Sequence, residues 1–304
     1  MLELFVYGVV HGSIIALGAI GLTLIFGILG FANFAHGDLM TSGAYIALFL
    51  VTGLFSWIGI PDTTFGPLSF GLRMALAFPI SMITVSAFAI LLDRLVYRKL
   101  RRKGSSAVML AMSALGASFI TRMTILIIWG SDYILFRPGV LRFALELPLG
   151  VKIRPDQIFL VLAVVFLVAT LHLFLQRTKM GKAMRATADN VDLARISGID
   201  TERIILWTWG IGGALAAAGG ILYGIDVQLH AGMGWNFILP LFAATILGTI
   251  GNIYGALLGG FVIGIAQQMS TAFILPTYKP AVAFFIMILI LLFRPQGIFG
   301  GSGK

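Results

Sequence analysis

The charged residues of the chain are so widely spaced that they leave eight long uncharged intervals. These intervals are 4–37, 39–61, 74–92, 104–121, 157–176, 204–225, 227–278 and 280–293. A helix needs about 20 mostly apolar residues to cross the hydrocarbon core of a membrane. The interval 227–278 is too long for one crossing and predicts two helices joined by a turn. The pattern therefore predicts an all-α, polytopic integral membrane protein with eight or nine transmembrane helices.

The composition supports the membrane class. Of the 304 residues, 59% are hydrophobic and only 11% are charged, whereas about 25% of the residues in an average soluble domain are charged. So few charges cannot cover the surface of a soluble protein of this size, which disfavours a soluble enzyme, a nucleic-acid-binding protein and a disordered chain. The absence of cysteine excludes disulfides, thiolate zinc sites and cysteine nucleophiles.

The net charge of +9 is explained by where the basic residues lie. Six of the 21 Lys and Arg residues fall in the link 94–103 and six more in the segment 177–203. The positive-inside rule assigns both links and the C-terminus to the cytoplasm. The loop 130–156 is then external, and so is the N-terminus if every interval crosses fully. The first interval lacks a basic N-terminal region and is too long for a secretory signal, so it is expected to be a retained span.

Two apolar segments are interrupted by Gly and polar residues, at 27–38 and 247–256, and each leads into a Gly-Ala pair. The resemblance between them indicates a loose internal repeat with broken or re-entrant helices. Interrupted helices at corresponding positions of two halves point to the substrate path of a transporter, because irregular backbone at membrane depth is tolerated only against protein or a water-filled cavity. The candidate path residues are Asn33, His36, Asp38, Ser42, Thr245, Gly248, Gly251 and Asn252.

Simpler roles remain open for several of these residues. Gly251, Gly255 and Gly259 recur every four residues, a spacing that also suits close helix packing. Asp38 is placed to act as an N-cap, and His36 can be an ordinary loop histidine. Three further polar residues lie inside or near the ends of spans and are given no role: Arg122, which can extend its charge toward the membrane surface, Asp226 and His172.

The segment 176–203 mixes basic and acidic residues and differs from the rest of the chain. Its Ala, Met, Arg and Leu residues favour a helix, and Gly198 is a good C-terminal stop. We therefore expect a short amphipathic cytoplasmic helix, which either docks a partner or simply connects two spans. The chain has no G-x-x-x-x-G-K-[ST] motif, so any ATPase must be a separate subunit.

Over nearly its whole length the chain resembles the LivH-type permease subunits of the branched-chain amino acid ABC importers. The matching segments are residues 21–30, 33–38, 180–186, 247–252 and 294–300. Asp192, Ala194 and Gly198 also resemble the Glu-Ala-Ala-x-x-x-Gly coupling loop of ABC importers, although Asp replaces Glu and Leu193 replaces the first Ala.

The resemblance implies a single transmembrane permease domain over 1–304 with no catalytic role. Its partners would be a second homologous permease (a heterodimer), two cytoplasmic ATPases that bind ATP and Mg²⁺, and a periplasmic solute-binding protein. The location would be the bacterial cytoplasmic (inner) membrane. No metal or cofactor is expected in this chain, and no nucleic-acid partner. The residues implied in ATPase coupling are Met180, Gly181, Arg185, Ala186, Asp189, Asp192, Ala194 and Gly198.

Two kinds of alternative function remain open: another cargo for the same type of importer, and a different class of membrane protein. The same machine could carry urea, short amides or small aromatic acids, and no residue in the sequence separates these cargoes. A stand-alone secondary transporter or channel would need an array of buried carboxylates or His residues for ion coupling, and the candidates here are few and scattered. An intramembrane enzyme would need a nucleophile–base pair or a metal cluster, and the sequence shows no such spacing.

Overall fold

The computed structural model describes residues 1–137, 144–147 and 150–300. The predicted external loop 130–156 and the end of the predicted domain 1–304 therefore lie partly outside the described residues. The elements are, in chain order, α1 (Leu2–Leu29), α2 (His36–Leu48), α3 (Phe55–Trp57), α4 (Leu72–Leu92), α5 (Arg98–Arg102), α6 (Ala107–Trp129), β1 (Leu145–Leu147), β2 (Val151–Ile153), α7 (Pro155–Arg177), α8 (Lys179–Asp189), α9 (Val191–Ile196), α10 (Thr201–Asp226), α11 (Met233–Leu247), α12 (Ile253–Ser270) and α13 (Lys279–Phe293).

Three short elements extend the longer helices. The π-helical turns Phe49–Leu54 and Asp93–Tyr97 join α2 to α3 and α4 to α5. A 3-10 helix, Pro276–Tyr278, precedes α13. The strands β1 and β2 form an antiparallel pair in which Leu145 lies opposite Ile153.

Within the described residues, eight helical stretches are long and apolar enough to cross a membrane. The shorter apolar helix α11 is a ninth candidate. The all-α class and the predicted eight or nine spans are therefore confirmed. The long interval 227–278 does divide into two helices, α11 and α12, as its length required.

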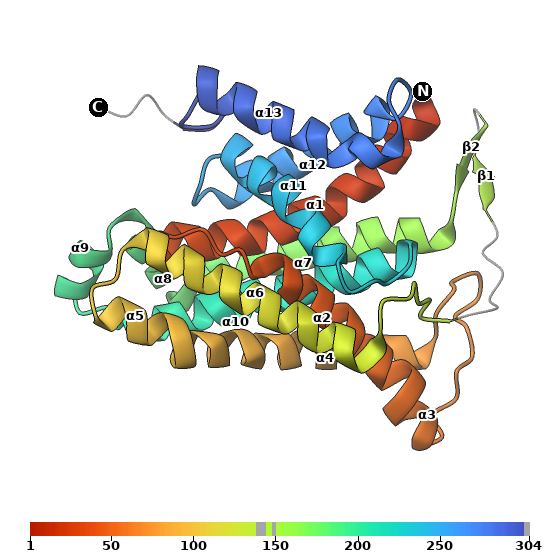
Figure 1. Ribbon diagram of the computed structural model, residues 1–304, viewed down its shortest axis with the longest axis horizontal. Helices are drawn as coiled ribbons and strands as arrows, with labels where there is room; N and C mark the ends of the chain where they lie inside the picture. Colours follow the sequence, from red (N-terminus) through yellow and green to blue (C-terminus); the bar gives the residue numbers. More distant parts are fainter. Residues whose placement is uncertain (138–143, 148–149, 301–304) are drawn as a thin grey trace.

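Most helices run along the long axis of the molecule (Figure 1). The two basic links lie at one end of this axis, at α5 and at α8–α9, together with the end of the described chain. The N-terminus, the β1–β2 pair and α3 lie at the opposite end. The N-terminus thus lies at the end opposite the basic links, and the positive-inside rule predicts that the basic end is cytoplasmic and the N-terminus external.

The helix α1 is the centre of the fold and is buried at nearly every position between Val10 and Ile25. It packs against α10, α11 and α12. The contact with α12 needs small residues on both helices, since a Cβ atom on Gly264 would overlap the backbone of Gly12, and one on Gly12 would crowd the backbone of Phe261. In a bilayer, where helices gain little by hiding apolar surface from lipid, such close backbone contact is a main source of association.

The outer helices expose large apolar side chains instead. Ile127 on α6, Phe166 on α7 and Leu292 on α13 are 85%, 69% and 72% exposed. Faces of this kind are rare on soluble monomers and suit lipid or another membrane subunit.

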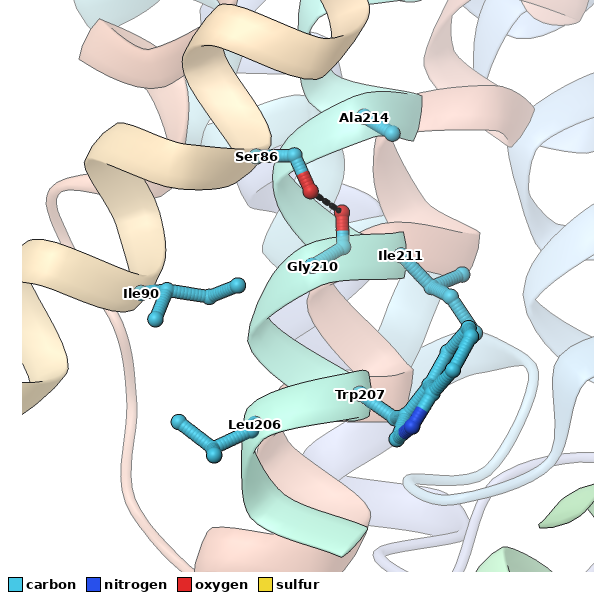
Figure 2. Close-up of a pocket in the computed structure, with 7 residues that line it drawn as sticks. All are labelled: Ser86, Ile90, Leu206, Trp207, Gly210, Ile211 and Ala214. Atoms are coloured by element: carbon cyan, nitrogen blue, oxygen red, sulfur yellow. Dashed lines mark hydrogen bonds between the residues drawn. The ribbon is translucent and has the colours of Figure 1, made fainter. Parts of the chain in front are cut away.

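An apolar groove of about 370 Å³ lies between α4 and α10 on this outer surface (Figure 2). Ile90 on α4 and Trp207 and Ile211 on α10 form part of its wall. The Ser86 hydroxyl donates to the Gly210 carbonyl oxygen at 2.7 Å, so this polar group is satisfied within the wall. The groove therefore offers mainly apolar contact, and a polar solute would gain little there.

Candidate functional site

The first interruption turns the chain back into the bundle between α1 and α2. The helix α1 ends at Gly30, which adopts the left-handed conformation with φ +70° that glycine accommodates readily. Asn33 Oδ1 then accepts a hydrogen bond from the Ala35 amide at 3.1 Å. His36 begins α2, and its Nε2 contacts the Gly18 carbonyl oxygen of α1 at 3.0 Å. Polar residues of this interruption are thus held inside the protein and not at its surface.

Two polar atoms at this interruption are buried and lack a hydrogen-bond partner among the described residues. They are Asn33 Nδ2 and His36 Nδ1. Both residues are 0% exposed. A buried polar group without a partner costs free energy and calls for an explanation such as a bound water, an ion or a function. The first interruption therefore carries unmet hydrogen-bonding capacity at membrane depth.

The second interruption separates α11 from α12. Thr249 and Gly251 both have positive φ, 76° and 86°, and Asn252 caps α12 by accepting from the Gly255 amide at 3.0 Å. The segment that follows α13 covers this turn, because the Ile298 amide donates to the Leu247 carbonyl oxygen at 2.8 Å.

The glycines around the second interruption serve different purposes. A Cβ atom on Gly255 would overlap Gly248, and one on Gly259 would overlap the Ala244 backbone. Helix packing is therefore confirmed for Gly255 and Gly259, which let α11 and α12 approach closely. Gly251 instead supplies the left-handed turn, and its amide donates to Thr23 Oγ1 of α1 at 2.8 Å.

The second interruption meets α1 near its cytoplasmic end. A Cβ atom on Gly27 would lie 2.8 Å from the Gly251 Cα atom. A cavity of about 30 Å³ lies beside this contact, between α1, α8 and the start of α12, and Met184 and Arg185 of α8 contribute to its wall. The cytoplasmic helix α8 therefore faces the contact between Gly27 and Gly251 across this small cavity.

The predicted path residues are distributed over three places along the bundle. His36 and Thr245 both contact the middle of α1, on the adjacent carbonyl oxygens of Gly18 and Ala19. The second interruption meets α1 one to two turns further on, at Thr23 and Gly27. The third place is the start of α2, where the Ser42 hydroxyl donates to the Asp38 carbonyl oxygen at 2.8 Å and the Asp38 carboxylate turns toward α6.

Asp38 is not the N-cap that its position suggested. The residue at the N-cap of α2 is Ala35, with no side-chain cap. The Asp38 carboxylate instead accepts two hydrogen bonds from the Arg122 guanidinium, both at 3.1 Å, and a third from the Ser118 hydroxyl. The guanidinium also lies over the Trp235 ring, 4.4 Å from its centroid.

Arg122 therefore does not extend its charge toward the membrane surface. Its side chain is 12% exposed and that of Asp38 is 1% exposed. The pair joins α2 to α6, and Trp235 adds α11 to the same cluster. Sequence reasoning missed this pairing, although a charged residue inside an apolar interval is itself a signal that a partner exists.

The other two unassigned residues also have partners. Asp226 pairs with Arg154, and His172 Nδ1 lies 2.6 Å from the Tyr254 hydroxyl.

The predicted cytoplasmic helix is in fact two helices, α8 and α9. Asn190 ends α8 and caps α9, accepting a hydrogen bond from the Leu193 amide at 2.9 Å, a geometry for which Asn is well suited. Gly198 follows α9 with φ +83°, so the predicted glycine stop is confirmed. Gly181 lies where a Cβ atom would overlap the end of α7, which lets α8 fold back sharply on the bundle.

The residues implied in coupling divide into an exposed and a packed group. The exposed group consists of Arg185, Ala186, Asp189, Asp192 and Gly198.

Gly181 and Ala194 are buried, and Met180 is half-buried. In this structure these residues hold the segment on the bundle. Sequence reasoning did not single out Leu193 and Ile196, which are 58% and 81% exposed on α9. Two exposed apolar side chains at a charged, cytoplasmic end are the better signal of a protein contact.

The comparisons with known proteins cover the whole of this architecture. Residues 4–291 match the family model described as the permease component of branched-chain amino acid transport systems. No solved structure matches the chain.

Three curated relatives illustrate how far the similarity extends. The high-affinity branched-chain amino acid transport permease BraD of Pseudomonas aeruginosa is 36% identical over 98% of this chain and 95% of its own. The corresponding LivH permease of Escherichia coli is 33% identical over 96% of this chain and 93% of its own. A probable LivH permease of Methanocaldococcus jannaschii is 30% identical over 97% of this chain and 91% of its own. The chain therefore belongs to the family of permease components of branched-chain amino acid transport systems.

Proposed function

We propose that the chain is the membrane-spanning permease subunit of an ATP-driven importer, and that its cargo is a branched-chain amino acid delivered by an external binding protein. The family match supports the permease role and the cargo class. The observation that carries the mechanism is the position of α8 beside the contact between Gly27 and Gly251. A cytoplasmic element in that position can convert the movement of a partner into a change at membrane depth.

The proposed coupling runs from the cytoplasm to the bundle. Leu193 and Ile196 offer an apolar contact to an ATPase subunit, which would bind ATP and Mg²⁺. Closure of two such ATPases would move α8 and α9 together. Met184, which is 1% exposed, would transmit this movement to the contact between Gly27 and Gly251. The permease itself performs no covalent step in this proposal.

The proposed path passes the first interruption. The unpartnered Asn33 Nδ2 and His36 Nδ1 atoms offer hydrogen bonds at membrane depth without placing a net charge there. A zwitterionic solute can be handled by such groups and by the backbone at helix interruptions. A second, homologous permease would complete the path, and the exposed apolar faces of α6, α7 and α13 are broad enough to include its contact.

The rival classes fit this geometry less well. A secondary transporter requires ionisable groups that can change their protonation or ion occupancy. The described pair at membrane depth, Asp38 and Arg122, is instead fully engaged with its neighbours. Among the described residues there is no group of three or more acidic or His side chains placed to hold a metal.

Reconstitution of the assembled importer tests the proposal. The chain, its partner permease, the two ATPases and the binding protein are placed in proteoliposomes with internal ATP, and uptake of labelled leucine is measured. We expect ATP-dependent leucine uptake that excess isoleucine or valine suppresses. Suppression by urea, a short amide or benzoate instead would show that the cargo is one of the alternatives. Uptake that proceeds without ATPase subunits would contradict the importer class.

Because the chain has no cysteine, the proposed path can be probed one position at a time. Single cysteines at Asn33, His36, Ser42 and Asn252 are exposed to a polar thiol reagent with and without ATP. We expect the modification rate to depend on the nucleotide at the positions that line the path. Labelling that is absent at all four positions, or indifferent to nucleotide, contradicts the path assignment.

A further inference from the structure

A cavity of about 510 Å³ opens at the external end of the molecule, where five helices meet. Its lining residues come from the N-terminal parts of α1, α7 and α13 and the C-terminal parts of α10 and α12. The cavity beside α8 at the cytoplasmic end holds only about 30 Å³. Another cytoplasmic cavity, between α1, α5, α9 and α10, holds about 390 Å³, so the external cavity is the larger of the two.

One wall of this external cavity carries a fixed pair of opposite charges. Arg154 Nη2 donates to Asp226 Oδ1 and, at 2.9 Å, to the Asp226 carbonyl oxygen. Gln157 Nε2 donates to the same carboxylate oxygen at 3.0 Å. These bonds tie the start of α7 to the end of α10. The carboxylate is therefore held in place at the wall, beside the Arg154 guanidinium.

The other wall carries a cation. Lys279 Nζ donates to Gln268 Oε1, a neutral amide, at 2.7 Å, and no ion pair among the described residues includes Lys279. The backbone at this position is anchored, because Gln267 Nε2 donates to the Lys279 carbonyl oxygen at 2.9 Å. A carboxylate entering the cavity would therefore find a positioned ammonium group.

Apolar and aromatic side chains complete the cavity. Val10 on α1 and Val227 at the end of α10 line it together with the Tyr223 ring, which is held edge-on against Phe237. Tyr7 and His11 of α1 also line it. Below the cavity α1 and α12 are in close contact, and the Gly12 position leaves no space beside Phe261. The packed helices therefore close the inner end of the cavity in this structure.

We propose that this cavity is the external receiving site for a zwitterionic amino acid with a short apolar side chain. The carboxylate binds Lys279, the ammonium group faces Asp226, and the side chain contacts Val10 and Val227. This inference rests on the proposed function, and it assigns to the permease itself a solute site that is separate from the two interruptions. A site of this kind receives cargo from the binding protein before the path opens.

Protection of a single cysteine tests the site directly. Val227→Cys is placed in the assembled complex and modified with a polar thiol reagent. The matched control is Ile274→Cys, because the native side chains are equally accessible, 42% and 40% exposed, and Ile274 does not line the cavity. We expect leucine to slow modification at 227 several-fold and to leave the rate at 274 unchanged. Leucinamide, which lacks the carboxylate, and isovalerate, which lacks the ammonium group, should not protect.

A second set of variants tests the assigned cation. Lys279→Gln should abolish leucine protection and Lys279→Arg should retain it. Lys152→Gln, at an exposed surface pair with Glu146, should have no effect. Equal protection by leucinamide or isovalerate, or protection that survives Lys279→Gln, overturns the inference. So does slow modification that depends only on the phospholipid present, since that result identifies a lipid headgroup as the occupant.

Uptake measured in parallel separates this inference from the proposed function. If the wild-type complex imports leucine but leucine gives no protection at position 227, the receiving site is wrong and the function stands. If leucine protects but the complex imports only urea or another solute, the proposed cargo is wrong.

Discussion

Asp38 and Arg122 form an ion pair inside the bundle, and Arg98 and Glu202 form one at its cytoplasmic end. The side chains of the interior pair are 1% and 12% exposed, whereas those of the cytoplasmic pair are 31% and 44% exposed. The interior pair also has a hydroxyl partner and an aromatic ring against it. The two ion pairs therefore differ in their effect on stability. The free-energy cost of losing one partner depends on whether water can replace that partner.

The difference extends to the regions around the two pairs. In the interior, glycines bring helix backbones together and buried polar groups are mostly paired, so substitutions there should act on folding. At the cytoplasmic end the charges are solvated and α9 exposes Leu193 and Ile196. Substitutions at that end should leave the fold intact and act on communication with a partner.

The largest effect is expected when the interior pair is broken on one side. Arg122→Leu leaves the Asp38 carboxylate buried without its counter-charge and should destabilise the protein by about 3–5 kcal/mol. Thermal unfolding of the purified protein in detergent measures this loss. The double variant Asp38→Asn with Arg122→Leu removes both charges and should regain part of the stability. A double variant no more stable than Arg122→Leu would contradict the ion-pair account.

Close packing of α1 on α12 gives the next largest effect. Gly264→Ala places a Cβ atom against the Gly12 backbone, and overpacking of this kind costs about 1–3 kcal/mol. The matched control is Gly116→Ala on α6, where a Cβ atom meets no atom within 4 Å. The control should be neutral or slightly stabilising, because alanine favours a helix over glycine. Equal unfolding temperatures for the two variants would contradict the packing argument.

Coupling should be lost at the cytoplasmic end with little change in stability. Ile196→Glu changes a side chain that is 81% exposed, so the free energy of unfolding should change by no more than about 0.5 kcal/mol. In the assembled complex, however, stimulation of ATP hydrolysis by the loaded binding protein should disappear. Ile58→Glu at the external end is the matched control, since that side chain is 57% exposed. Full stimulation in Ile196→Glu would contradict the docking role of α9.

Position 196 is a sharper reporter than position 194 for this purpose. Ala194 is 3% exposed, so Ala194→Asp would bury a charge and disturb the packing of α9 itself. The exposed position separates a lost contact with a partner from a misfolded segment.

The smallest effect is expected for the exposed ion pair. Glu202→Gln should lower the stability by less than about 1 kcal/mol, because both side chains of the pair are partly exposed, 31% and 44%. Raising the salt concentration should reduce the difference from wild type further. Unfolding curves at low and high salt measure both effects. A loss as large as that of Arg122→Leu would remove the distinction between the two pairs.

Much of the fold could be predicted because the bilayer imposes a local rule. A span needs its own run of apolar residues, since backbone groups must be satisfied within the segment. The spacing of charges therefore located the spans, divided 227–278 into α11 and α12, and placed both basic links at one end. Gly198 also ended its segment as predicted, since the left-handed conformation is a local property of glycine.

The site could be predicted only in part. The composition showed which residues interrupt the helices. It did not show that Gly27 and Gly251 lie together, or that α8 lies beside these two glycines. The orientation of short helices was also out of reach, because Leu193 and Ala194 are neighbours in the chain and yet one is exposed and the other buried.

The sequence by itself determined the membrane class and the spans, because each of these depends on the residues of one segment. Only the tertiary structure decided that Asp38 meets Arg122, 84 residues away, and that five helix ends enclose the external cavity. Those outcomes depend on which helices pack together, and the packing is set by small contacts between distant segments, such as that between Gly12 and Gly264.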